Sequence, residues 1–204
     1  MTRVTKDKIE RRNELIEAAE RLFIEQGYDQ TAVSDIVKAV RVAQGTFYYH
    51  FASKAEVLEA VIEKLIHRLH DEFHRISGRD DLDPAGKMNA IANSIMAVPS
   101  SRPDLMEVLH QESNVVLHDK MVIMTSDALI PHVTEVLANG VASGQFRVTH
   151  PRETAEIMVA ALTYVLHQSD LWFDAARLER VKGTLEDTLS RVLGAEGYTF
   201  QLNM

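Results

Sequence analysis

The amino-acid sequence predicts an all-α protein with a small N-terminal three-helix domain over residues 8–66 and a larger helical domain over residues 67–204. Apolar residues recur every three or four positions through most of the chain, whereas alternating strand-like runs are scarce. Proline and glycine punctuate these periodic segments, and no internal repeat or long linker separates them. We therefore expect the two domains to share the helix that starts near Ser53.

The expected helices begin and end at local signals. Gly27 follows the first apolar stripe and predicts the end of the first helix. At the start of the shared helix, the Ser53 side chain can accept from the Glu56 amide while Glu56 reaches back to the Ser53 amide. Pro131 predicts a kink or a local break inside a long helix. The expected helices span residues 8–26, 33–40, 44–50, 53–76, 84–98, 103–115, 119–142, 151–173 and 176–193.

Charge is distributed unevenly along the chain. The net charge of −8 opposes a nucleic-acid partner, since Lys and Arg supply most non-specific affinity for phosphate. Residues 1–54, however, hold 9 Lys and Arg against 8 Asp and Glu, and residues 55–204 hold 13 against 22. A small DNA-reading domain is therefore compatible with the acidic total.

Composition also bears on the compartment. The chain has no cysteine, which excludes disulfides and thiolate metal sites. It shows neither a run of about eighteen apolar residues nor the apolar core of a signal peptide. We therefore expect a cytoplasmic protein without a membrane span.

Residues 31–54 predict two short helices joined by a tight turn, which is the arrangement of a helix-turn-helix. In such a motif the second helix presents its N-terminal residues to base edges in the major groove, while the first crosses the DNA backbone. Inward side chains hold the two helices at the required angle. The inward set is Ile36, Val37, Val40, Val42, Phe47 and Phe51.

The outward side chains of this motif are candidates for contact with double-stranded DNA. Gln44 can pair with adenine, Thr46 can reach bases or phosphates, and Gly45 permits close approach of the backbone. Tyrosine hydroxyls and the His50 ring suit phosphate oxygens, and Lys54 adds a charge near the start of a helix. The predicted DNA-binding set is Thr31, Gln44, Gly45, Thr46, Tyr48, Tyr49, His50 and Lys54.

The most specific pattern is the ordered set Gly27-Tyr28, Thr31, Asp35-Ile36, Val42, Gly45-Thr46-Phe47-Tyr48-Tyr49-His50-Phe51 and Ser53-Lys54. With this set the chain resembles the tetracycline-repressor (TetR) family over about residues 8 to 66. It departs from the family pattern at Ala32, Val37, Arg41 and Ala43. Arg41 replaces a customary glycine in the turn, at a position that commonly has positive φ.

The resemblance implies a sequence-specific transcription regulator, commonly a repressor, that forms a homodimer and leaves its operator when a small organic effector binds. An effector site needs a few polar groups in an apolar setting. The candidates in the C-terminal part are His110, Asn114, His118, His132, Tyr164 and His167. Ordinary buried or surface polar roles remain the alternative for each of them.

The resemblance also implies pairing through the last two long helices. On the final helix one apolar stripe consists of Leu178, Val181, Leu185, Leu189 and Val192. We interpret this stripe as the dimer interface, with an intrachain core as the alternative.

Three other classes of function remain open. His67, His70 and His74 lie on one side of a helix away from its apolar stripe, so a metal-responsive regulator is an alternative to simple solvated histidines. No phosphate loop, nucleophile elbow, His-Glu-x-x-His motif or convincing carboxylate pair is present, which disfavours an enzyme and predicts no cofactor. A nucleoid protein would bind random duplex as tightly as any operator.

Overall fold

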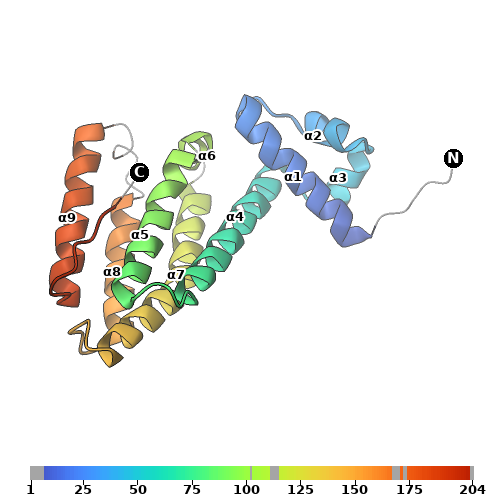
Figure 1. Cartoon of the computed structure of the whole chain (residues 1–204). Helices are drawn as coiled ribbons and strands as arrows, with labels where there is room; N and C mark the ends of the chain where they lie inside the picture. Colours follow the sequence, from blue (N-terminus) through green and yellow to red (C-terminus); the bar gives the residue numbers. More distant parts are fainter. Residues whose placement is uncertain (1–6, 102, 111–114, 167–170, 172–173, 203–204) are drawn as a thin grey trace. The chain divides into compact units, whose positions relative to one another are not determined.

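The computed structural model describes residues 7–101, 103–110, 115–166, 171 and 174–202. Within these ranges every regular element is a helix (Figure 1), which confirms the all-α prediction. The elements are α1 (Lys8–Gln26), α2 (Val33–Val40), α3 (Gln44–His50), α4 (Lys54–Ser77), α5 (Pro84–Ser101), α6 (Pro103–Leu109), α7 (Val115–Ala142), α8 (Pro151–Leu166) and α9 (Ala175–Leu193).

The later helices differ from expectation at several places. The helix expected over residues 103–115 ends at Leu109, and α7 begins at Val115 rather than at residue 119. The end expected for α8 at residue 173 lies outside the described residues. α7 continues without a break through Pro131, although this residue cannot donate a hydrogen bond to the preceding turn.

The described residues form two compact units. Unit 1 lies within residues 1–65 and 102–117, and unit 2 lies within residues 66–101 and 118–204. The first half of α4 therefore belongs to unit 1 and its second half to unit 2, as expected for a shared helix. The short helix α6 belongs to unit 1 despite its place in the middle of the sequence.

Unit 1 is built on the apolar faces of α1 to α4. α1 contacts α2 and α6, and α2 contacts α3. Four of the predicted inward residues are buried, namely Ile36, Val37, Phe47 and Phe51, whereas Val40 and Val42 are half-buried. The buried aromatic rings fix α3 with one side inward, which leaves its other side at the surface.

Unit 2 has a continuous apolar core to which α5, α7, α8 and α9 contribute, and these helices run alongside one another in Figure 1. Gly140 of α7 packs directly on the Phe146 ring. A Cβ added at Gly140 would lie 2.0 Å from Cδ2 of Phe146, so only glycine allows this contact. The ring is itself buried in the core of unit 2.

The segment after α9 is part of the same core. Phe200 and Leu202 are buried. The Leu202 amide donates to Oε1 of Glu186 on α9 at 2.7 Å, and the Gln201 amide donates to Oδ1 of Asn89 on α5 at 2.8 Å. We call residues 195–202 the tail; it links α9 to α5.

One described helix, α7, is long and apolar enough to cross a bilayer. A single such helix is a weak indication of a membrane protein, because the core helices of globular proteins have the same length and composition. α7 buries Leu129, Val133, Val136 and Leu137 inside unit 2.

Candidate DNA-binding surface and ligand cavity

The recognition helix α3 buries its apolar side and exposes its polar side. Phe47 is fully buried, whereas Tyr48 and Tyr49 on the same helix are 54% and 68% exposed. Gln44 and Gly45 in the first turn are also exposed, and nothing lies within 4 Å of a Cβ built at Gly45. The side of α3 expected to meet DNA is therefore open at the surface of unit 1.

The turn before α3 depends on one residue with unusual backbone geometry. Arg41 caps α2 with φ 58° and ψ 47°, which is left-handed backbone, and it is the only non-glycine residue with positive φ in the described part of the chain. The conformation expected for the glycine of the family pattern is thus kept by an arginine. Its amide donates to the carbonyl of Lys38 at 3.1 Å, which closes the end of α2.

The N-terminal caps of α2 and α4 differ in which capping hydrogen bonds they form. Ala32 offers no side-chain acceptor at the start of α2, and only the return bond exists, from the Ala32 amide to Oδ2 of Asp35 at 2.9 Å. At α4, Oγ of Ser53 accepts from the Glu56 amide at 3.2 Å, as predicted. The Glu56 carboxylate accepts from the amide of Ala52 rather than from that of Ser53.

Thr31 is a structural residue, which corrects its assignment to DNA contact. It is only 1% exposed, and its hydroxyl donates to the carbonyl of Gly27 at 2.7 Å while accepting from Nε2 of Gln26 at 3.2 Å. With its hydroxyl occupied inside unit 1, Thr31 fixes the chain between α1 and α2. The sequence motif alone does not distinguish these two roles of a threonine.

Lys54 also has a partner inside unit 1. Its Nζ donates to the carbonyl of Tyr28 at 2.7 Å and lies 4.1 Å from the centre of the Tyr28 ring, a cation–π arrangement. Burial raises the pKa of Tyr28, and the nearby Asp29 raises it further. Lys54 therefore attaches the start of α4 to the segment after α1, and any phosphate contact comes in addition to this role.

Basic residues of α1 lie beside α3, and sequence reasoning missed them. Nζ of Lys8 lies 5.1 Å from the centre of the Tyr49 ring, and the Arg12 guanidinium lies 5.0 Å from that of Phe51. Burial lowers the pKa of His50, and Lys8, Arg12 and Arg11 lower it further. The His50 ring thus lies next to cationic groups that disfavour its protonation. The basic residues in the first turns of α1 were the signal in the sequence.

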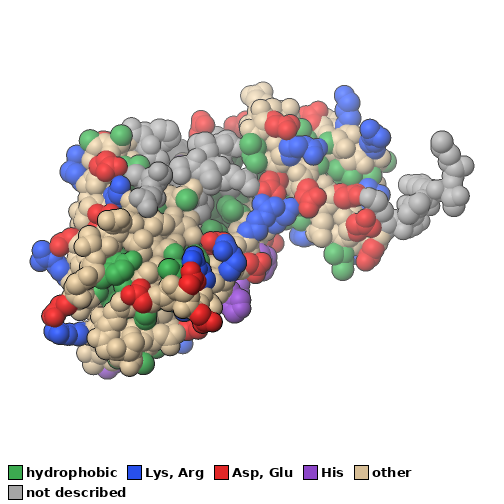
Figure 2. Space-filling view, in the orientation of Figure 1, with side chains coloured by type: hydrophobic (Ala, Val, Ile, Leu, Met, Phe, Trp, Pro, Cys, Tyr) green, Lys and Arg blue, Asp and Glu red, His purple; other side chains and the backbone are tan. Residues whose placement is uncertain are grey.

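Charge on the face drawn in Figure 2 is mixed. On the face drawn in Figure 2, acidic and basic side chains alternate over both units and no extended area of one sign appears. This mixture agrees with the small excess of Lys and Arg in residues 1–54.

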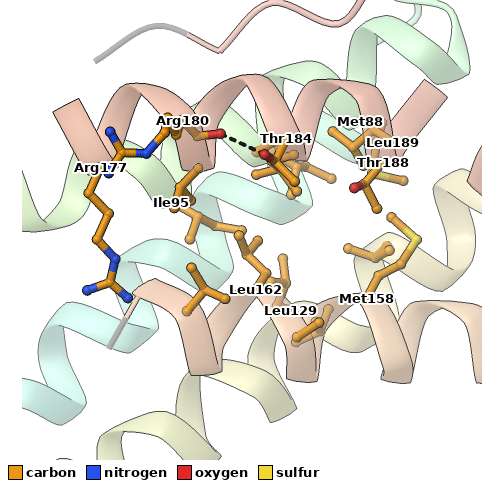
Figure 3. A pocket seen from close by; sticks show the side chains of 18 residues that line it. Met88, Ile95, Leu129, Met158, Leu162, Arg177, Arg180, Thr184, Thr188 and Leu189 are labelled. Carbon is orange, nitrogen blue, oxygen red and sulfur yellow. Dashed lines mark hydrogen bonds between the residues drawn. The ribbon is translucent and has the colours of Figure 1, made fainter. Parts of the chain in front are cut away.

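Unit 2 contains a cavity of about 470 Å³, within the range of about 300 to 1,000 Å³ that accommodates drug-sized molecules. Figure 3 shows its walls, which come from α5, α7, α8 and α9. Most of the lining is aliphatic or methionine, including Ile95, Leu129, Met158 and Leu162. Such a lining is typical of a site for an apolar organic molecule.

Two family models match the chain. Residues 15–61 match "Bacterial regulatory proteins, tetR family", and residues 97–182 match "Tetracyclin repressor-like, C-terminal domain". The chain is 32% identical over 172 residues to the transcriptional regulator TtgR of Pseudomonas putida, an alignment that covers 79% of this chain and 80% of TtgR. This chain belongs to the tetR family of bacterial regulatory proteins. It is a helix-turn-helix DNA-binding regulator and not an enzyme.

Other TetR-family proteins agree in sequence or in fold. The probable regulator ArpR of Pseudomonas putida is 35% identical over 117 residues, which span about half of either protein, 55% in each case. The structure of SmeT, the repressor of the Stenotrophomonas maltophilia multidrug efflux pump SmeDEF, superposes with a TM-score of 0.67 at 22% identity over 95% of this chain and 96% of SmeT. TetR-family regulators bind operator DNA as dimers.

The residues expected to bind the effector in this TetR-family chain do not line the cavity. His110 lies at the end of α6 in unit 1, with Nδ1 2.6 Å from the carbonyl of Met106. His118 lies beside Asp119 at the start of α7, and Tyr164 is 70% exposed on α8. Asn114 and His167 lie outside the described residues. Ligand contact by this set stays a prediction, independent of the cavity.

The apolar stripe of α9 is core, which corrects its assignment as the dimer interface. Leu189 is buried, and Leu178, Val181 and Leu185 pack against the unit 2 core. Only Val192 of the five is exposed. Periodicity identified the apolar side of α9 correctly, but α5, α7 and α8 of the same chain cover that side.

His70 and His74 of α4 lie close to His132, which was not part of the predicted metal site. His132 of α7 is 6% exposed, and its ring centre lies 5.0 Å from that of His70 and 5.9 Å from that of His74. Oγ of Ser77 lies 3.4 Å from Nδ1 of His132. Among the residues that the structure describes, no group of three His, Cys, Asp or Glu is arranged to hold a metal, and the proposed trio with His67 is not brought together.

Proposed function

We propose that the chain is a transcriptional repressor that releases operator DNA when a small organic molecule occupies the cavity of unit 2. The cavity carries this proposal, because it lies within one unit while the exposed recognition helix α3 belongs to the other. Coupling between two ligands requires two distinct sites and an element that both can bias. The helix α4, which contributes residues to both units, is that element in this proposal.

DNA binding is assigned to the exposed side of α3. Gln44 reads a base edge, Gly45 allows close approach, and the hydroxyls of Tyr48 and Tyr49 contact phosphates. Lys8 and Arg12 add positive charge beside the helix. Two copies of α3 enter successive major grooves in a homodimer, and the effector shifts α4 so that their spacing no longer fits the operator.

The dimer interface is assigned to the outer side of α8. Ile157 and Tyr164 are 71% and 70% exposed, and the exposed Ala160 lies between them on the same side. Large exposed apolar side chains at this spacing are typical of a surface that a partner covers. Val192 of α9 adds a further exposed apolar side chain.

The names of relatives support repression, and DNA binding supports a cytoplasmic location. SmeT is described as the repressor of a multidrug efflux pump, and IcaR of Staphylococcus epidermidis, 26% identical over 124 residues, as a negative transcriptional regulator. Binding to chromosomal DNA requires a cytoplasmic location.

A cavity-filling substitution tests the release mechanism. An operator is first selected from random duplexes. The affinity of the chain for this operator is then measured by fluorescence anisotropy, with and without a panel of neutral, anionic and cationic organic compounds that have apolar bodies. Ala92→Phe places a ring in the cavity, so operator affinity should persist while release by any active compound is lost. Ala97→Phe, on the same helix but exposed and outside the cavity lining, should respond as the wild type does.

Two results would contradict the proposal. The cavity is not an effector site if Ala92→Phe is as responsive as the wild type at unchanged thermal stability. Repression is wrong if a reporter placed under the selected operator is transcribed less when the chain is absent.

A further inference from the structure

The polar residues of the cavity all come from one helix. The walls from α5, α7 and α8 contribute only apolar side chains, whereas α9 contributes four polar residues. These are Arg177, Arg180, Thr184 and Thr188, at spacings of three and four residues that place them along one side of α9. They extend over about 16 Å of helix, beside the apolar residues Val181, Leu185 and Leu189.

The charged groups gather at one end of this line. In Figure 3, Arg177 and Arg180 lie together at one end, and Met158, Thr188 and Leu189 lie at the other. The hydroxyl of Thr184 donates to the carbonyl of Arg180 at 2.7 Å, so its proton is used within α9. The cavity therefore has a cationic end and an apolar end.

The charged side chains that line the cavity are all of one sign among the described residues. Of the described residues that line the cavity, two are cationic and none is acidic, although the whole chain has a net charge of −8. Arginine stays protonated at any physiological pH, and its planar guanidinium can form two parallel hydrogen bonds to a carboxylate. A molecule with an anionic head would match one end of the cavity, and an apolar body would match the rest.

We propose that the effector is an amphipathic anion: a carboxylate bound at Arg177 and Arg180, with an alkyl or aryl body extending between α5, α7 and α8 towards Met158. This proposal rests on the proposed function only in naming the molecule an effector. The binding preference itself is a property of the cavity and is measurable without DNA.

Three probes with the same alkyl chain separate charge from apolar contact. Calorimetric titration of the full-length chain uses decanoate, decan-1-ol and decyltrimethylammonium, each below its micelle concentration. Decanoate should bind at least about tenfold more tightly than the other two, because only its carboxylate can accept charged hydrogen bonds from the two guanidinium groups. The double variant Arg177→Gln/Arg180→Gln should lose this preference and keep the affinity for decan-1-ol.

Matched variants control for charge and for folding. Arg152→Gln and Arg191→Gln remove exposed arginines that pair with Glu156 and Asp187, and both should keep the preference for decanoate. Arg180→Gln alone, with Arg177 and the start of α9 left intact, should reduce the preference in part if the double variant is unstable in thermal melts.

The outcomes distinguish the two proposals. Equal affinity for the three probes, or tighter binding of decyltrimethylammonium, overturns the anionic class. Arginine-dependent binding of decanoate that leaves operator affinity unchanged supports the ligand class and contradicts the release mechanism. An anion preference that survives loss of both arginines overturns their assignment.

Discussion

At the scale of single residues, Arg41 occupies backbone space that favours glycine. Its left-handed conformation costs an L-residue about 1–2 kcal/mol. Glycine would avoid this cost, but it would also raise the conformational entropy of the unfolded chain, which offsets part of the gain. Arg41→Gly should therefore raise the free energy of unfolding by about 0.5–1 kcal/mol in urea titrations. Arg41→Ala, which removes the charge but keeps a Cβ, is the control. Equal stability of these two variants would show that φ is not strained here.

A substitution at Gly45 should have opposite effects on folding stability and on DNA affinity. A Cβ there meets nothing within 4 Å, so Gly45→Ala should stabilise α3 by about 0.5–1 kcal/mol through helix propensity. The added methyl would lie where the backbone approaches DNA, and operator affinity should fall by about 1–3 kcal/mol. Anisotropy with operator and with random duplex measures the loss. Unchanged affinity for the operator would place Gly45 away from the DNA.

His132 makes stability depend on pH. Burial lowers its pKa, and His70 and His74 lower it further, while Glu135 acts in the opposite direction. As pH falls through about 6.5, the unfolded chain binds a proton that native His132 does not, so the native state loses up to about 1.4 kcal/mol per pH unit until the lowered native pKa is reached. The loss between about pH 7.5 and about pH 5.5 should be smaller in His132→Leu. Identical losses would mean that His132 titrates normally.

At the scale of elements, α7 packs directly on Phe146 at Gly140. Gly140→Ala would place a methyl 2.0 Å from the ring, and neither the helix backbone nor the buried ring can move freely. We expect a loss of about 1–3 kcal/mol from this overpacking, although alanine favours helix. The double variant Gly140→Ala/Phe146→Leu should recover part of the loss. A Gly140→Ala chain as stable as the wild type would show that Phe146 repacks without cost.

Helix ends were predictable from the sequence because their signals are local. Gly27 ends α1 with φ 87°, and Ser53 begins α4 through a bond to an amide three residues later. The helix-turn-helix and its inward aromatic residues were found for the same reason. Thr31 was misjudged because the pattern shows the residue type and not that its hydroxyl is turned inward to the Gly27 carbonyl. The bond from Lys54 to the Tyr28 carbonyl was not predicted because the two residues lie far apart in the sequence.

The cavity and the interface were harder to predict because periodicity reports which side of a helix is apolar and not what covers it. The α9 stripe was correctly identified as apolar and wrongly placed at a subunit contact. The line from Arg177 to Thr188 did not stand out in the sequence, because polar residues at this spacing are typical of the solvated side of a helix. Only packed neighbours reveal that empty volume lies against it.

At the scale of the whole molecule, substitutions to glutamate should have different effects on the outer side of α8 and on the apolar stripe of α9. Ile157→Glu/Tyr164→Glu puts carboxylates on the proposed dimer contact, and the variant should sediment near the 23.0 kDa chain mass with helix content retained, whereas the wild type sediments near twice that mass. Operator affinity should fall with the loss of the second half-site. Leu185→Glu should unfold unit 2 instead. A monomeric wild type would contradict the proposed homodimer. A dimeric double variant would show that the dimer contact lies on another surface.

The tail has a consequence for genetics. Phe200 and Leu202 fill the interior of unit 2, and the amides of Gln201 and Leu202 bond to α5 and α9. A stop codon or frameshift just before Phe200 would delete two core side chains, which in most proteins costs several kcal/mol, a large part of total stability. In a screen for colonies with derepressed target genes, nonsense alleles just before the codon of Phe200 should therefore be recovered as readily as alleles in the recognition helix.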